Sequence, residues 1–193
     1  FNPSAIAFDI VFSEEDKQNP QDLLLKLQKE SDQVISANVL NTNKIFIESI
    51  SKSKVILPVL GEPNDNFVEN NSKPKLKIIT KGENAKNFLY SYKNKIISLE
   101  EINNAASGIG AISLIPNIDG IIRNIPLLYN IDNQIWPSLA LEAIRIATNQ
   151  KNLLVQSDKS GISVIKTRKD VFPGDQNGII NIKYNKFNKE NYI

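Results

Sequence analysis

The chain lacks three residue types: its 193 residues include no cysteine, no histidine and no methionine. The absence of cysteine excludes disulfides, thiolate chemistry and cysteine-based zinc sites. The absence of histidine removes the usual proton shuttle near neutral pH and the commonest metal ligand, and it excludes a Ser-His-Asp triad. We therefore expect no cofactor, no metal site and no catalytic residues, and we predict that this domain is not an enzyme.

Long apolar runs are missing as well. No stretch approaches the roughly 18 apolar residues that a membrane-spanning helix needs, and Asp9 interrupts the nearest candidate. The chain opens inside the apolar stretch 5–8, without a methionine or a charged leader. We therefore expect a piece excised from a longer protein, with any membrane anchor outside this sequence.

Basic residues are not in excess. Lys and Arg number 23 against 21 for Asp and Glu, and the net charge of +2 leaves no surplus of cations for neutralising many phosphates. The densest basic stretch, residues 73–77, has no aromatic residues for stacking bases and is typical of a solvated loop. We expect no nucleic acid partner. Arginine occurs only at positions 123, 145 and 168, so each arginine is a candidate for a specific role.

The first half of the chain predicts alternating strands and helices within a single domain, residues 1–193. An apolar strand is expected over 5–12, a helix beginning at Pro20 after the N-cap residue Asn19, a second helix from Thr42, and a buried strand over 55–60. This order indicates an α/β fold, a mixed sheet flanked by helices. Residues 62–80, rich in Pro and Asn at their start, are predicted to be an exposed loop or insertion.

The second half begins with a predicted capping box at residues 98–101, which starts a helix that ends near Gly108. Strands over 111–115 and 121–129, joined by a turn at Asp119-Gly120, are expected to form a β-hairpin. A further helix is predicted to begin at Pro137.

The last part of the chain predicts strands over 162–165 and 179–184. Trp136, just before Pro137, is expected to pack as a hydrophobic staple, although it can also cover a ligand.

Few residues point to a ligand site. Gly108 and Gly110 do not make a dinucleotide loop, because the expected order is helix then strand and the fingerprint needs strand then helix. Arg123 lies between apolar neighbours, so its charge needs a partner, and Asp9 is the expected one. We predict Asp9, Asp119 and Arg123 as ligand-binding residues, although a structural ion pair explains Arg123 more simply. A pocket is expected near the carboxyl ends of the strands 5–12 and 55–60.

Three segments occur together in a distinctive order: residues 105–110 (Ala-Ala-Ser-Gly-Ile-Gly), residues 117–127 with the Asp-Gly turn, Arg and Pro-Leu, and residues 136–142 with Trp-Pro-Ser-Leu-Ala-Leu-Glu. This series resembles the type-two CHASE domain, the cyclase and histidine-kinase associated sensory extracellular domain. The resemblance extends to residues 7–12 and 175–184 and so spans most of the chain.

The chain departs from that family at two positions. The family often has Asp where Asn117 stands and a second Arg where Asn124 stands, so charge-based binding through these two residues is not implied. The family also usually carries another strand and helix before the first matching segment, which implies that part of the sheet lies outside this sequence.

The resemblance implies an extracytoplasmic (periplasmic or cell-surface) sensor held between membrane helices. Its output domain would be a cytoplasmic adenylate or guanylate cyclase, a histidine kinase of a two-component system, a protein kinase or a diguanylate cyclase. We expect an unknown small-molecule or protein signal as its partner, and a homodimer in the full receptor. The alternative is a dimerisation or assembly module that binds no ligand.

Overall fold

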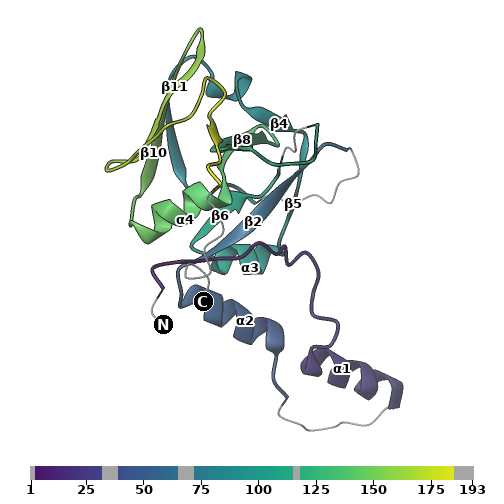
Figure 1. Cartoon of the computed structure of the whole chain (residues 1–193). Helices are drawn as coiled ribbons and strands as arrows, with labels where there is room; N and C mark the ends of the chain where they lie inside the picture. The colour runs from purple at the N-terminus through teal and green to yellow at the C-terminus, as the bar shows by residue number, and fades with distance from the viewer. Residues whose placement is uncertain (1–2, 32–38, 65–71, 115–117, 185–193) are drawn as a thin grey trace.

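The computed structural model describes residues 3–31, 39–64, 72–114 and 118–184. Its elements are drawn in Figure 1. In chain order they are β1 (Ile6–Ala7), α1 (Pro20–Ser31), α2 (Thr42–Ser51), β2 (Val55–Glu62), β3 (Lys77–Gly82), the 3-10 turn η1 (Ala85–Asn87), β4 (Tyr90–Tyr92), β5 (Asn94–Ile97), α3 (Glu100–Ala105), β6 (Gly108–Ala111), β7 (Asn124–Pro126), β8 (Leu128–Ile131), β9 (Gln134–Pro137), α4 (Leu139–Ala147), β10 (Asn152–Asp158), β11 (Gly161–Lys166), β12 (Val171–Phe172) and β13 (Ile179–Asn181).

The first sheet is organised around the buried strand β2. It runs parallel to β1 and β6 and antiparallel to β5. Pro58 lies in the middle of β2, where a proline normally costs a ladder hydrogen bond. The carbonyls of Val55 and Val59 accept hydrogen bonds from the β6 side, and the backbone groups of alternate residues point to opposite edges, so the nitrogen of Pro58 faces the edge away from β6. On that edge, β1 pairs only as far as Ile56 and β5 pairs only from Val59 onward. The proline nitrogen therefore points to an edge with no strand beside it, while on the other edge Pro58 is in register with Gly110 of β6.

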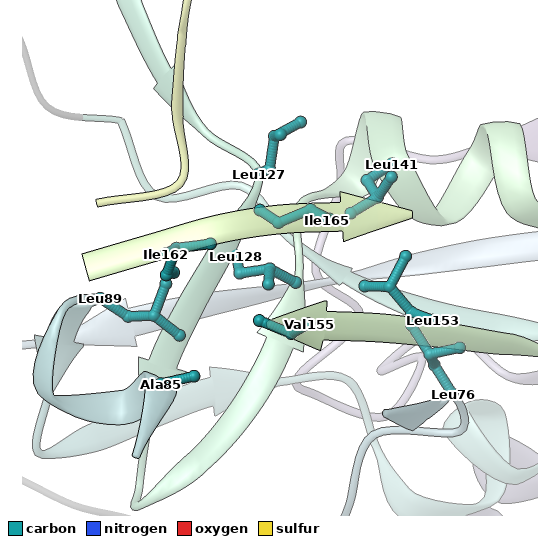
Figure 2. Packing of buried hydrophobic residues seen from close by; sticks show 10 residues of the cluster. All are labelled: Leu76, Ala85, Leu89, Leu127, Leu128, Leu141, Leu153, Val155, Ile162 and Ile165. Atoms are coloured by element: carbon teal, nitrogen blue, oxygen red, sulfur yellow. The ribbon is translucent and has the colours of Figure 1, made fainter. Parts of the chain in front are cut away.

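The second sheet has the order β12-β11-β10-β3, and there are two small sheets with the orders β4-β8-β9 and β13-β7. One face of β10 and β11 is buried: Leu153, Val155 and Ile165 are at most 1% exposed. Figure 2 shows these side chains gathered around Leu128 of β8, with Leu141 of α4 beside them. The opposite face of this sheet is left partly open, and it forms part of the site described below.

The helices lie around the first sheet. α2 and α3 bury Ile50 and Ile102 in one cluster with Val55 and Leu57 of β2. α4 packs against β6 so closely that a Cβ added to Gly110 would lie 2.6 Å from Leu139 Cα. α1 extends away from the rest of the fold (Figure 1).

The predicted mixed α/β fold is confirmed, and so are the helices beginning at Pro20 and Thr42 and the strand over 55–60. Asn41 caps α2, because its side chain accepts from the Lys44 amide at 2.9 Å. Residues 77–80 of the predicted loop 62–80 belong to β3, and residues 65–71 lie outside the described residues. The strand β10 was not predicted.

The predicted buried strand over 5–12 is wrong in extent. Only residues 6 and 7 pair with β2, and Ile6 is 38% exposed, because β1 is an edge strand in the described part of the sheet. The predicted capping box is also wrong: the Ser98 hydroxyl accepts from the Phe12 amide at 3.0 Å, and α3 begins without a side-chain cap. α3 ends at Ala105, and Gly108 begins β6 instead of terminating the helix.

The predicted hairpin around Asp119-Gly120 is not formed by its expected strands. β6 pairs with β2, and β7 pairs with β13, so each strand finds its partner elsewhere in the chain. The turn at residues 118–120 is present, with φ of +77° at Gly120. A tight hairpin joins β8 and β9 instead, through Asp132 and Asn133, which both have positive φ.

The helix predicted at Pro137 begins two residues later, at Leu139, with the Ser138 hydroxyl accepting from the Leu141 amide at 3.3 Å. Pro137 is instead the last residue of β9, because the β8–β9 pairing extends to Leu128 and Pro137. Trp136 is fully buried and its indole donates to the Ile131 carbonyl at 3.1 Å, which confirms the packing interpretation.

One buried tyrosine predicts a pH dependence of stability. The Tyr129 hydroxyl donates to the Ser113 carbonyl at 2.5 Å, and burial raises the pKa of Tyr129 well above its ordinary value of about 10. In the unfolded chain the phenol ionises near pH 10, while in the folded chain it keeps its proton. The folded state then binds more protons, so the stability present below about pH 10 is lost as the pH rises above it, by up to about 1.4 kcal/mol per pH unit.

Tyr129→Phe should remove this part of the pH dependence, as measured by urea denaturation between about pH 9 and pH 11. Tyr184→Phe, at a tyrosine that is 66% exposed, is the matched control and should leave the pH dependence as in the wild type. Parallel curves for the wild type and Tyr129→Phe would contradict the prediction.

Candidate functional site

The three predicted ligand-binding residues do not come together as expected. Arg123 pairs with Asp119 through two hydrogen bonds of 2.9 and 2.7 Å, on a loop where both side chains are about half exposed. The hydrogen bonds from the Arg123 guanidinium, followed by the Ile121 amide, lower the pKa of Asp119. Asp9 is exposed and is not the partner of Arg123, because the local spacing i, i+4 gives Arg123 a carboxylate within its own loop. Ligand binding by these residues stays a prediction.

The structure has a cleft elsewhere, at one end of the second sheet. The cleft has a volume of about 620 Å³, in the range of small-molecule sites. It lies between three chain segments: the connection from α4 to β10, the turn from β11 to β12, and the outer face of β3. The lining residues are Ile79, Thr148, Asn149, Gln150, Lys151, Asn152, Leu154, Lys166, Thr167, Arg168 and Lys169. We call this region the sheet-end cleft.

The base of the sheet-end cleft is apolar on one side and basic on the other. In the strand register, Leu154 of β10 lies between Lys166 of β11 and Ile79 of β3, so the three side chains form a row across the outer face. Ile79 is 43% exposed and Leu154 is half-buried. The cleft therefore offers apolar surface next to a cation.

The turn from β11 to β12 holds two more cations at the rim. Thr167 closes this turn: its amide donates to the Asp170 carbonyl at 2.8 Å, and its hydroxyl accepts from the Asp170 amide at 3.0 Å. Thr167 is buried, whereas Arg168 and Lys169 between them are exposed. The turn thus holds two exposed basic side chains at the rim of the cleft.

The wall of the cleft is connected to a buried ion pair inside α4. Arg145 and Glu142 form two hydrogen bonds of 2.7 and 2.6 Å, with side chains that are 8% and 0% exposed. The Arg145 guanidinium also donates to the carbonyl of Gln150, a cleft residue, at 2.7 Å. On the other side, Gly108 of β6 lies against Glu142, leaving no room for a side chain. One guanidinium therefore links the cleft wall to α4 and, through Glu142, to the first sheet.

A second contact connects the cleft to the start of the first sheet. The Lys54 ammonium, directly before β2, donates to the Asn149 side chain at 2.7 Å. Asn149 has φ of +56°, a left-handed conformation that asparagine tolerates and that turns the chain from α4 towards β10.

Two smaller clefts are less suited to a ligand. One, of about 460 Å³, lies where α1 and α2 begin, and its acidic and amide side chains already bond to one another, as Asn19 does to Asp22 at 2.9 Å. The other, of about 470 Å³, lies between residues 3–6 and 52–54. None of the three clefts is lined by Asp9, Asp119 or Arg123.

Sequence reasoning missed the residues of the sheet-end cleft. The scarcity of arginine was the available signal, because two of the three arginines, Arg145 and Arg168, prove to be a cleft support and a cleft residue. Within the described ranges no group of three or more Asp and Glu side chains is placed to hold a metal ion. The cations of the cleft suit an anion and not a metal.

The family model described as the CHASE2 domain matches residues 1–193. This chain belongs to the CHASE2 domain family, extracellular sensory domains of signalling receptors that are not themselves catalytic. No curated protein and no solved structure is significantly similar to it. Among the residues that the structure describes, no helix is long and apolar enough to cross a membrane.

The structure explains why two of the recognised segments occur together. Gly108 and Gly110 belong to the segment 105–110, and they contact Glu142 and Leu139 of the segment 136–142. The small residues of β6 permit α4 to approach the first sheet, and Glu142 of the α4 ion pair is buried against Gly108 at this contact.

Proposed function

We propose that this chain is the ligand-sensing extracytoplasmic domain of a transmembrane receptor, and that the sheet-end cleft receives the signal. The receptor's output domain would be a cytoplasmic nucleotide cyclase, histidine kinase, protein kinase or diguanylate cyclase. The observation that carries the proposal is the Arg145 guanidinium, which joins the cleft wall at Gln150 to the buried carboxylate of Glu142. A ligand that moves this wall would therefore act on the Arg145 guanidinium, which is bound to the buried Glu142 carboxylate.

The relay we propose is a shift between two arrangements of the domain. A ligand shifts such an equilibrium only by its difference in affinity for the two states. The contacts between the ligand and the cleft wall must therefore differ between the two arrangements. The connection from α4 to β10 carries two contacts to other parts of the fold, Arg145 to Gln150 and Lys54 to Asn149. Movement of this connection would change how α4 packs on β6, and it would change the position of Lys54 at the start of β2.

A thermal-shift screen of the 193-residue chain against small metabolites tests the proposal. A ligand at about 100 times its Kd stabilises the folded state by about 2.7 kcal/mol, which raises the Tm by roughly 5 °C or more for a domain of this size. We expect the stabilisation by such a hit to be reduced in Arg168→Gln and unchanged in Arg123→Gln.

The two variants separate the cleft from the loop that the sequence suggested, because each removes one exposed arginine. A hit lost only in Arg123→Gln would move the site to the Asp119 loop. The absence of any hit across a broad library would contradict ligand sensing by this chain.

A second candidate function is the assembly module. α1 presents Leu23, Leu25 and Leu27 at 43%, 49% and 54% exposure, and in Figure 1 the helix extends away from the fold. Helices that leave apolar faces open commonly cover them in a partner, and a second copy of the chain is the partner we propose. A chain that forms a stable dimer in solution and yet gives no hit in the screen would favour this function.

A further inference from the structure

We infer that the sheet-end cleft binds a small organic anion, a molecule that carries phosphate or carboxylate oxygens on an apolar body. This inference rests on the proposed sensing function and names the chemical class of the signal. The anionic group can belong to a soluble metabolite or to the headgroup of a lipid, and the chemistry of recognition is the same for both.

The first observation is the charge of the lining. Four of its eleven residues are cationic, Lys151, Lys166, Arg168 and Lys169, and none is acidic. The whole chain has a net charge of only +2, so this concentration of one sign is local. Positive charge gathered in a concave surface attracts anions and raises their local concentration.

The second observation is that these cations have no carboxylate partner. In the described part of the chain the ion pairs join Lys17 to Glu14, Lys95 to Asp132, Arg123 to Asp119 and Arg145 to Glu142, and none involves a cleft residue. Asp170, the acidic residue in the adjoining turn, receives a hydrogen bond from the Thr167 hydroxyl at 3.3 Å and does not line the cleft. The cleft cations are thus available to an incoming anion.

The third observation decides against a bare inorganic ion. The row from Lys166 through Leu154 to Ile79 places apolar surface beside the charge, and Ile79 is 43% exposed. An apolar body packed on Leu154 and Ile79 removes that surface from water, while Arg168 can grip two oxygens of one anionic group. A cleft of about 620 Å³ has room for both parts.

Isothermal titration of the chain with 1-naphthyl phosphate and with 1-naphthol tests the inference, because the two probes share the apolar body and differ in the anionic group. We expect the phosphate to bind at least about tenfold more tightly than the alcohol, and to weaken as salt screens the charges. The variant Lys166→Gln/Arg168→Gln should lose about tenfold in affinity for the phosphate. Circular dichroism checks that it is folded, and Arg168→Gln alone should show a smaller loss.

Lys159→Gln is the matched control. Lys159 is an exposed lysine at the other end of the β10–β11 hairpin and is absent from the cleft lining, so its loss removes one positive charge without touching the site. Its affinity for the phosphate should stay within about twofold of the wild type, since screening weakens charges more than a Debye length apart. Equal weakening by Lys159→Gln and Arg168→Gln, or equal affinity for phosphate and alcohol, would overturn the inference.

Sedimentation with vesicles separates the two sources of the anion. Vesicles of phosphatidylglycerol that retain the wild type but not Lys166→Gln/Arg168→Gln, with phosphatidylcholine vesicles inactive, would identify a lipid headgroup. Binding of the soluble phosphate alone would identify a soluble metabolite, and both results support the anionic class. Naphthyl phosphate binding that leaves the output of the intact receptor unchanged would contradict the proposed sensing function while the ligand class stands. A receptor response to the anion that is unchanged in Arg168→Gln would overturn the assignment of the anion to the sheet-end cleft, while sensing by the receptor would stand.

Discussion

Replacing Arg145 by methionine is expected to lower the free energy of unfolding by about 3–5 kcal/mol. The Glu142 carboxylate is 0% exposed and has the Arg145 guanidinium on both of its oxygens, at 2.7 and 2.6 Å. Without the guanidinium, a buried charge is left without its counter-ion. The Gln150 carbonyl loses its donor in the same step. Urea denaturation followed by circular dichroism measures the loss.

The double replacement Glu142→Leu/Arg145→Met is the control for this result. It removes both charges and fills the space with apolar groups, a change that is often close to neutral in a protein interior. We therefore expect the double variant to be more stable than Arg145→Met alone. If the single variant costs less than about 1 kcal/mol, then Glu142 finds other partners and the ion pair is not the support that we describe.

Gly110→Ala is expected to cost about 3 kcal/mol, at the upper end of the usual range for overpacking. A Cβ at this position would lie 2.6 Å from Leu139 Cα and 2.8 Å from Leu139 N, so it meets backbone and not the flexible end of a side chain. α4 would have to move off β6 to admit one methyl group. The decrease in Tm of the purified variant measures this cost.

Gly120→Ala distinguishes a steric effect from a conformational one. Gly120 has φ of +77°, and a Cβ there would meet nothing within 4 Å, so the expected cost is only that of a left-handed backbone, about 1–2 kcal/mol. Gly110 is not among the glycines with positive φ, so its cost comes from packing. A Gly110→Ala variant no less stable than Gly120→Ala would show that α4 adjusts on β6 without difficulty.

The two expected results concern the same joint, which we define as the contact of α4 with β6 and with the wall of the sheet-end cleft. Gly110 sets how closely α4 approaches β6, and the Arg145–Glu142 pair ties α4 to the wall of the sheet-end cleft. A smaller change at this joint, one that leaves the chain folded, is therefore expected to alter the response to a ligand even though it touches no cleft side chain. In the relay proposed above, this contact between α4 and the cleft wall is where a ligand would act on the rest of the domain.

Local sequence signals determined the elements whose cause is local. The apolar run at 55–60, the N-cap Asn41 before α2 and Pro20 at the start of α1 each act within one or two turns of the chain. The order of the segments 105–110, 117–127 and 136–142 was sufficient to indicate the family that the whole chain matches.

Tertiary structure alone decided which of these elements meet. Arg123 is the exception: it was expected to pair with Asp9, but it pairs with Asp119, which lies only four residues away in the sequence. Local patterns could not predict which strands pair. β7 pairs with β13, far along the chain, because that edge is available and the edge of the expected hairpin partner is not. The sheet-end cleft is the clearest case, since Lys151, Lys166 and Arg168 become neighbours only when β10 and β11 pair and the turn at Thr167 closes. The sequence gives the charge of a side chain, but its long-range partners depend on distances between side chains that only the packed fold sets.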